Sequence, residues 1–166
     1  MNRLSAALDL ADDRVADVVA LLIERGQTVA TAESLTAGLV TAVLTTVPGS
    51  SAVVRGGLVV YATDLKAGLA GVSAELLAEH GAVHPDVAVA LAEGARTTCG
   101  ADWGIGLTGV AGPDPQDGVA PGRVYLGVAG PAGSTSRMLD FQGDRHAVRA
   151  ASVGAAIDAM YMALTG

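Results

Sequence analysis

The sequence predicts an α/β fold, a three-layer αβα sandwich in which helices cover both faces of one mixed sheet. Segments with apolar residues at helical spacing alternate along the chain with short β-branched runs, a pattern typical of layered α/β domains. The 166 residues are about the usual size of one domain. No charge block, Ser-rich linker or internal repeat divides them, so we expect residues 1–166 to form a single domain.

The composition indicates how the core is built. Hydrophobic residues make up 51% of the chain but aromatic residues only 3%, which predicts Ala, Val and Leu packed at close backbone distances. The 22 glycines agree with that expectation. Charged residues account for only 16%, and the mean hydropathy is positive, which excludes an intrinsically disordered chain.

Charge and cysteine content exclude several classes of partner. A net charge of −7, with no local cluster of basic residues, disfavours nucleic-acid binding. The apolar runs are shorter than the roughly 20 residues that a membrane span needs. The first 17 residues carry acids where a signal peptide carries bases. Cys99 is the only cysteine, which fits a reducing compartment, so we expect a cytoplasmic protein.

Each element has a local justification. The first helix meets a natural stop at Gly26, and Pro48 follows the second. Ser73 and Asp144 are N-cap residues for later helices, and Pro85 opens another. In chain order we expect helix 4–24, strand 28–32, helix 35–46, strand 58–61, helices 64–69, 73–79 and 85–97, strands 103–107 and 124–128, an edge strand 134–141, and helix 144–164.

Polar residues follow the first predicted strand. Ser34 and Thr36 lie where this strand meets a helix, and ligands of α/β folds usually bind beyond the carboxyl ends of strands. Their hydroxyls suit an anionic or carbonyl-bearing ligand. Alternatively, Ser34 only caps the helix.

A second polar group surrounds the next predicted strand. The sequence Pro-Gly-Ser-Ser precedes it, and Tyr61 and Lys66 follow it. A serine nucleophile needs a base, and a lysine held neutral by burial serves this purpose in Ser-Lys hydrolases. Lys66 is the only lysine in a chain that otherwise uses arginine, which favours a special role over that of a solvated surface lysine.

Two further segments carry polar groups. Thr108 and Gly109 open a glycine-rich turn that lacks the spacing of a P-loop or a dinucleotide-binding motif. Arg145 and Arg149 are one helical turn apart, where they either grip a phosphate or serve as surface charges.

The sequence gives little support for a metal or for a reactive cysteine. His80 and His84 have i, i+4 spacing, but Gly81 and Pro85 interrupt a helix there. The loop from Asp114 to Asp117 lacks the EF-hand spacing of a cation site. We expect neither a metal nor an organic cofactor. We interpret Cys99 as a small buried residue and not as a nucleophile.

Taken together, these segments carry a family resemblance, which rests on A-E-S-L-T-A-G, P-G-S-S with G-G and Y-x-x-x-x-K, G-A-V-H, L-T-G-V-A-G-P and F-Q-G-D-R-x-x-V-R. In this order and spacing they resemble the C-terminal domain of the competence/damage-inducible protein CinA, whose stand-alone members are nicotinamide mononucleotide deamidases. The resemblance extends over residues 6–164. It departs at Leu35 and Ala37, where the family usually has Cys and Gly, and at Ala62 and Thr63, where it commonly has Ser and Asn.

The resemblance implies hydrolysis of the carboxamide of nicotinamide mononucleotide, without a cofactor, by an enzyme that tends to form homodimers. Ser51 matches the family's nucleophile, Lys66 its base and Tyr61 an orienting residue. The alternative is a non-catalytic nucleotide-binding or partner-binding module. Long family members carry a further N-terminal domain, for which 166 residues leave no room. The residues expected to line the pocket are Ser34, Thr36, Gly38, Gly56, Thr108, Gly109, Arg145 and Arg149.

Overall fold

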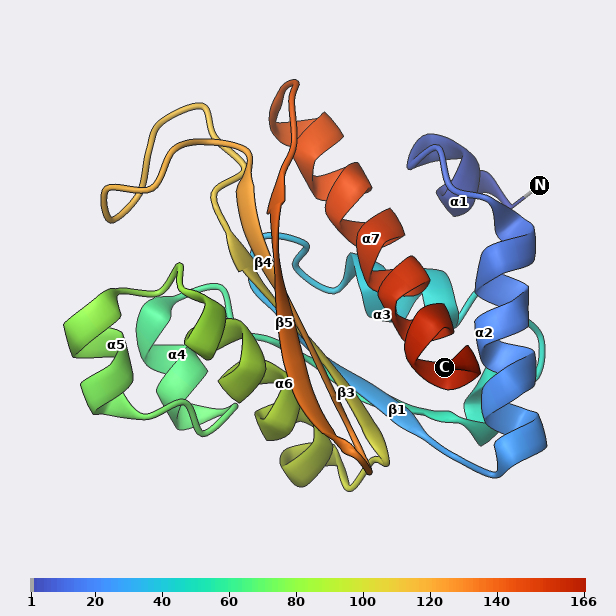
Figure 1. Cartoon of the computed structure of the whole chain (residues 1–166). Coiled ribbons are helices and arrows are strands. Elements are labelled where there is room, and N and C mark those ends of the chain that lie inside the picture. Colours follow the sequence, from blue (N-terminus) through green and yellow to red (C-terminus); the bar gives the residue numbers. More distant parts are fainter. Residues whose placement is uncertain (1) are drawn as a thin grey trace.

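A single mixed sheet forms the centre of the computed structural model, which describes residues 2–166 (Figure 1). Its strands are β1 (Val29–Glu33), β2 (Val54–Val59), β3 (Trp103–Gly109), β4 (Arg123–Gly130) and β5 (Gly133–Asp140). They lie in the order β2-β1-β3-β4-β5. The pairs β1–β2 and β1–β3 are parallel, whereas β3–β4 and β4–β5 are antiparallel. The predicted mixed sheet is confirmed, with β5 at its edge.

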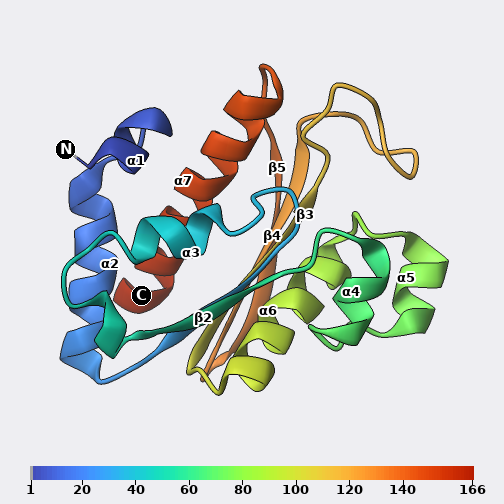
Figure 2. The ribbon, with the colours of Figure 1, turned by 180° about the vertical axis from the view of Figure 1, so that it is seen from behind.

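Helices cover both faces of this sheet. They are α1 (Arg3–Ala7), α2 (Asp12–Arg25), α3 (Leu39–Leu44), the 3₁₀ helix η1 (Ser50–Ala52), α4 (Thr63–Gly68), α5 (Ala74–His80), α6 (Pro85–Cys99) and α7 (Arg145–Thr165). Helices α2, α3 and α7 lie on one face, and α4, α5 and α6 lie on the other (Figures 1 and 2). This arrangement is the expected three-layer sandwich.

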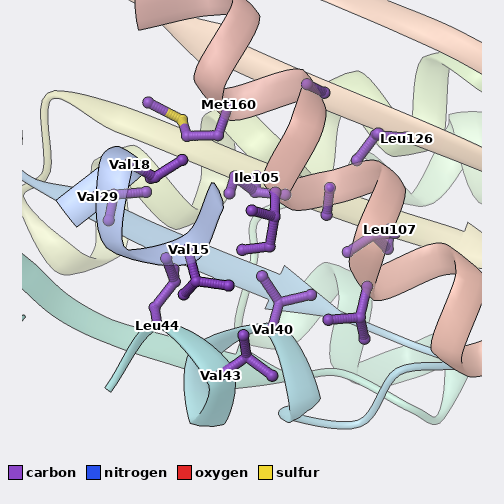
Figure 3. Close-up of a cluster of buried hydrophobic side chains, with 14 of the residues drawn as sticks. Val15, Val18, Val29, Val40, Val43, Leu44, Ile105, Leu107, Leu126 and Met160 are labelled. Atoms are coloured by element: carbon purple, nitrogen blue, oxygen red, sulfur yellow. The ribbon is translucent and has the colours of Figure 1, made fainter. Parts of the chain in front are cut away.

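Each face has its own hydrophobic core. The larger cluster joins α2, α3 and α7 to the sheet, and includes Val18, Val43, Ile105 and Met160 (Figure 3). The smaller cluster, which includes Ala32 and Leu91, lies under α4, α5 and α6. Most of these side chains are Ala, Val or Leu, as the composition predicts.

Helix α6 packs unusually close to the sheet. A Cβ atom added at Gly106 of β3 would lie 2.5 Å from the backbone nitrogen of Ala92 and would also meet the carbonyl oxygen of Ala88. A Cβ atom at Gly127 of β4 would meet the same carbonyl. Glycine at these positions therefore lets the helix backbone contact the strands directly.

Three predicted elements differ from the structure. The helix expected over 4–24 is two helices, because Asp9 adopts a left-handed conformation at φ 52° between α1 and α2. The helix expected over 35–46 begins only at Leu39, because Ala37 and Gly38 have φ of 49° and 93°. The strand expected over 58–61 is β2, which pairs with β1 only as far as Val59. The two middle residues of β2 are glycines, which weaken the local strand signal.

Helix α7 is long and apolar enough to cross a membrane by length and hydropathy alone. Half of this apolar stretch is nevertheless buried within the fold. Its buried residues, including Val153, Ile157 and Met160, pack in the larger core, so α7 serves here as a core helix.

Candidate functional site

Lys66 and Ser34 meet in the interior. The Nζ atom of Lys66 lies 3.1 Å from the Ser34 hydroxyl, and it donates to the carbonyl oxygens of Val60 and Tyr61 at 2.9 and 3.2 Å. Lys66 is 2% exposed and Ser34 is 7% exposed. These three contacts account for all three directions of the amine.

The parallel pairing of three strands brings this pair together. Glu33, the last residue of β1, is aligned with Val59 of β2 and Leu107 of β3. Ser34 therefore emerges beside the ends of both neighbours, and its N–H donates to the carbonyl of Leu107 at 3.1 Å. Lys66 lies on α4, which follows β2 after a short connection. The carboxyl ends of adjacent parallel strands thus supply both groups.

The environment of Lys66 favours its neutral form. Burial lowers the pKa of Lys66 below its ordinary value, because a charged amine loses its hydration there. The carboxylate of Asp117 opposes this effect and raises the pKa. When neutral, the amine can still donate to the two carbonyls, and its lone pair is left to accept the proton of the Ser34 hydroxyl.

A cleft of about 430 Å³ opens onto this pair. The volume lies within the usual range of roughly 300–1,000 Å³ for small-molecule sites. Its walls combine polar and apolar side chains. The cleft is lined by Ser34, Leu35, Tyr61, Ala62, Thr63, Lys66, Ala82, Val83, residues 108–112, Asp114, Gln116 and Arg145.

The floor and the mouth of the cleft differ in chemistry. Ser34, Lys66 and Thr108 are buried, and the Thr108 hydroxyl donates to the carbonyl of Ala82 at 2.6 Å. At the exposed side, Arg145 donates to the Tyr61 hydroxyl and to the carbonyl of Gly112, both at 2.9 Å. The cleft therefore has a hydroxyl beside an amine at its floor and a guanidinium at its mouth.

Ser51 does not lie beside Lys66. It is exposed on η1, which precedes β2, whereas Lys66 follows the end of that strand. A six-residue strand spans about 20 Å, so the two residues belong to opposite ends of the sheet. The expected Ser51–Lys66 pair is corrected: the serine beside the lysine is Ser34.

Four other expected pocket residues lie outside the cleft lining. Thr36 is fully buried, and the N–H of Gly38 donates to Glu33. Gly56 lies within β2, where it pairs with β1. Arg149 points to the backbone after Ser34: its Nε donates to the carbonyl of Leu35 at 2.8 Å. By contrast, Ser34, Tyr61, Lys66, Thr108, Gly109 and Arg145 all line the cleft as expected.

The structure offers no cluster of metal ligands. Among residues 2–166, no group of three or more His, Cys, Asp or Glu side chains is arranged to hold a metal ion. His80 and His84 stack their rings with centroids 4.1 Å apart, and His84 caps α6 by accepting from the N–H of Asp86. His84 therefore has a role in helix capping.

The sequence carries a signal that places Ser34, and not Ser51, beside Lys66. Ser34 and Lys66 both follow parallel strands, whereas Ser51 precedes one, and only the first arrangement brings two groups to the same edge. Asp114 and Gln116 were not expected in the pocket, because their loop carries no motif. Glu33 was also missed, since a buried carboxylate inside a strand is identified only by its partners.

Comparison with known proteins agrees with this architecture. Residues 11–164 match the model of the CinA C-terminal domain family. A CinA-like protein of Frankia casuarinae is 46% identical over 157 residues, which cover 94% of this chain and 36% of the relative. A CinA-like protein of Anaeromyxobacter sp. (strain K) is 50% identical over 148 residues, with coverage of 89% and 36%. The chain thus spans about a third of the length of these curated relatives.

A solved structure shows the same fold. The crystal structure of a competence-damaged protein (CinA) superfamily member from Klebsiella pneumoniae 700603 matches with a TM-score of 0.88 at 32% identity. The match covers 92% of this chain and 96% of that one. The arrangement of sheet and helices described above is therefore shared almost completely.

Proposed function

This chain belongs to the CinA C-terminal domain family, and we propose that it is an amidohydrolase that converts nicotinamide mononucleotide to nicotinate mononucleotide and ammonia. Ser34 is the nucleophile and Lys66 the base. The observation that carries the proposal is the distance of 3.1 Å between Ser34 Oγ and Lys66 Nζ at the floor of the cleft.

Acylation starts from neutral Lys66. Its lone pair takes the Ser34 proton while the serine oxygen attacks the carboxamide carbon. The N–H of Leu35, the next residue along the cleft wall, is our candidate donor to the oxyanion that develops. Protonated Lys66 then delivers its proton to the leaving amide nitrogen, so that ammonia departs and an acyl-serine ester remains.

Deacylation repeats these steps with water. Lys66, neutral again, takes a proton from a water molecule whose oxygen attacks the ester carbon. The proton returns to Ser34 as the carboxylate leaves, which restores both groups. Throughout the cycle the carbonyls of Val60 and Tyr61 hold the amine of Lys66 in place.

Substrate binding follows the polarity of the cleft. The carboxamide lies at the buried floor, and the planar ring fits between the small apolar side chains of Ala82 and Ala111. Arg145 at the mouth supplies donors to the phosphate, because two of its guanidinium nitrogens contact Gly112 and Tyr61 and further N–H groups remain.

A matched pair of serine variants tests the reaction. We expect purified protein to release ammonia from nicotinamide mononucleotide, Ser34→Ala to lose about 10³-fold or more in kcat, and Ser51→Ala to retain the wild-type rate. Loss of activity in Ser51→Ala with retention in Ser34→Ala would overturn the assignment. Binding of the nucleotide without ammonia release would instead favour a non-catalytic nucleotide-binding module.

A further inference from the structure

We propose that Glu33 and Arg149 are positioning residues for Ser34, which together clamp the turn formed by residues 34–38 at its two ends. Neither contacts the cleft: Glu33 holds backbone N–H groups, and Arg149 holds backbone carbonyls. The inference rests on the proposed role of Ser34 as nucleophile and adds two residues that act on it through the backbone.

The Glu33 carboxylate is fully buried and surrounded by donors. Its Oε2 accepts from the N–H groups of Gly38 and Val40 at 3.0 and 3.1 Å, and Oε1 accepts from the N–H of Thr41 at 2.9 Å. The hydroxyls of Thr31 and Thr41 also donate to Oε1, at 2.9 and 3.1 Å. One side chain thus satisfies N–H groups that the start of α3 would otherwise leave without partners.

Glu33 and Ser34 are consecutive residues with opposite surroundings. Side chains alternate across a strand, so Glu33 lies against α3 on one face of the sheet, and Ser34 reaches Lys66 of α4 on the other. The carboxylate therefore cannot exchange a proton directly with the serine. Its influence on Ser34 passes through the backbone of the turn.

Arg149 holds the start of the turn, whereas Glu33 binds the N–H of Gly38 at its end. It projects from α7, and its Nε donates to the carbonyl of Leu35 at 2.8 Å, while Nη2 reaches the carbonyl of Thr36 at the longer distance of 3.5 Å. Leu35 directly follows the nucleophile, so this contact fixes the Leu35–Thr36 peptide group, one peptide bond beyond the one that joins Ser34 to Leu35. Of the two arginines considered for phosphate binding, Arg149 therefore binds the backbone instead.

The turn between these two clamps is strained. Ala37 and Gly38 are consecutive residues with positive φ, at 49° and 93°. An alanine with positive φ is disfavoured, and such conformations persist only where the surrounding structure enforces them. Loss of a clamp would let the turn relax, and the Ser34 hydroxyl would move away from Lys66.

The test uses Glu33→Gln, Arg149→Met and Arg149→Lys in the full chain. Gln keeps the shape of Glu33 but places an NH₂ group against N–H donors, Met keeps the stem of Arg149 without donors, and Lys restores a single donor. Ser152→Ala is the matched control, because Ser152 is as fully buried as Glu33 and lies on α7 with Arg149, but its hydroxyl bonds only to the carbonyl of Val148.

Two readouts separate this inference from the proposed function. The first is ammonia release: we expect Glu33→Gln and Arg149→Met to lower kcat by about 10²-fold with little change in KM, because nucleophile position is lost while the cleft remains. The second readout, which needs no nucleotide, is the rate at which a fluorophosphonate probe modifies Ser34. Mass spectrometry shows that the modification is on Ser34. We expect this modification rate to fall together with kcat in Glu33→Gln and Arg149→Met. It should recover in part in Arg149→Lys and stay at the wild-type value in Ser152→Ala.

Each outcome has one meaning. Wild-type probe rates at Ser34 in folded Glu33→Gln and Arg149→Met would overturn the clamp, and so would an equal loss in Ser152→Ala, which would show a general structural effect. If Glu33→Gln does not fold, the comparison of Arg149→Met with Arg149→Lys decides. Probe rates that follow the clamp variants, without ammonia release by the wild type, would overturn the proposed substrate but support the clamp. No modification of Ser34 in the wild type would overturn both.

Discussion

Arg145 of α7 and Tyr61 after β2 join across the mouth of the cleft, with Nη2 2.9 Å from the tyrosine hydroxyl. Two segments separated by 84 positions in the sequence thus meet where an anionic group of the substrate would enter. The contact also explains why Tyr61 keeps its place although 58% of it is exposed.

Arg145→Ala should raise KM for nicotinamide mononucleotide by roughly 10-fold to 100-fold, with a smaller effect on kcat. A charge-assisted hydrogen bond is worth about 1.5–3 kcal/mol, and the phosphate is bound equally in ground and transition states. Steady-state kinetics with the nucleotide and with nicotinamide riboside check this, because the riboside has no phosphate and should not discriminate between the proteins. Arg137→Ala, on β5, is the control. A pure kcat effect would contradict a phosphate-binding role.

The pH dependence of kcat/KM should follow Lys66. Only the neutral amine acts as a base, so activity should rise with pH through the pKa of Lys66, which burial places below its ordinary value. Asp117→Asn removes the charge that raises this pKa, so the rising limb should move to lower pH. Asp17→Asn, on the exposed side of α2, should leave the profile in place. An unmoved profile in Asp117→Asn would show that another group controls the limb.

The free energy of unfolding should also depend on the pKa of Lys66. Lys66 has a lower pKa in the folded state than in the unfolded chain, so between the two values the unfolded chain binds more protons. The free energy of unfolding therefore rises with pH over that window, towards the ordinary value of 10.5. Urea titrations at pH 7 to 10 should show this slope in the wild type and a reduced slope in Lys66→Met. Equal slopes would mean that Lys66 is not desolvated.

Gly57→Ala should destabilise the fold by about 1–3 kcal/mol, which lowers Tm by roughly 2–12 °C. A Cβ atom there would lie 2.7 Å from Thr31 Oγ1 and would also meet the hydroxyl of Thr41, the two groups that bond Glu33. Gly68→Ala is the matched control, because a Cβ atom at Gly68 has nothing within 4 Å. Calorimetry on both variants tests the claim, which an unchanged Tm in Gly57→Ala would contradict.

Much of the architecture follows from local patterns. The alternation of elements, the caps at Ser73 and Asp144 and the edge position of β5 each depend on a few neighbouring residues, and the structure confirms them. The sequence also identifies Ser34, Lys66 and Thr108 as polar groups near strand ends, and Arg145 as one of two arginines in the first turns of a helix. The predicted start of α3 is wrong, because no local pattern indicates that Ala37 adopts a positive φ.

The sequence by itself determined the layered fold, the family and the four polar segments that surround the cleft. Only the tertiary structure decided which serine meets the lysine, and that Arg149 and Glu33 hold the backbone of the turn. The physical reason is that helical and strand periodicity are local properties, whereas contacts at the edge of a sheet depend on register. The alignment of Glu33 with Val59 and Leu107 sets Ser34 beside Lys66, and it is fixed by packing between distant segments.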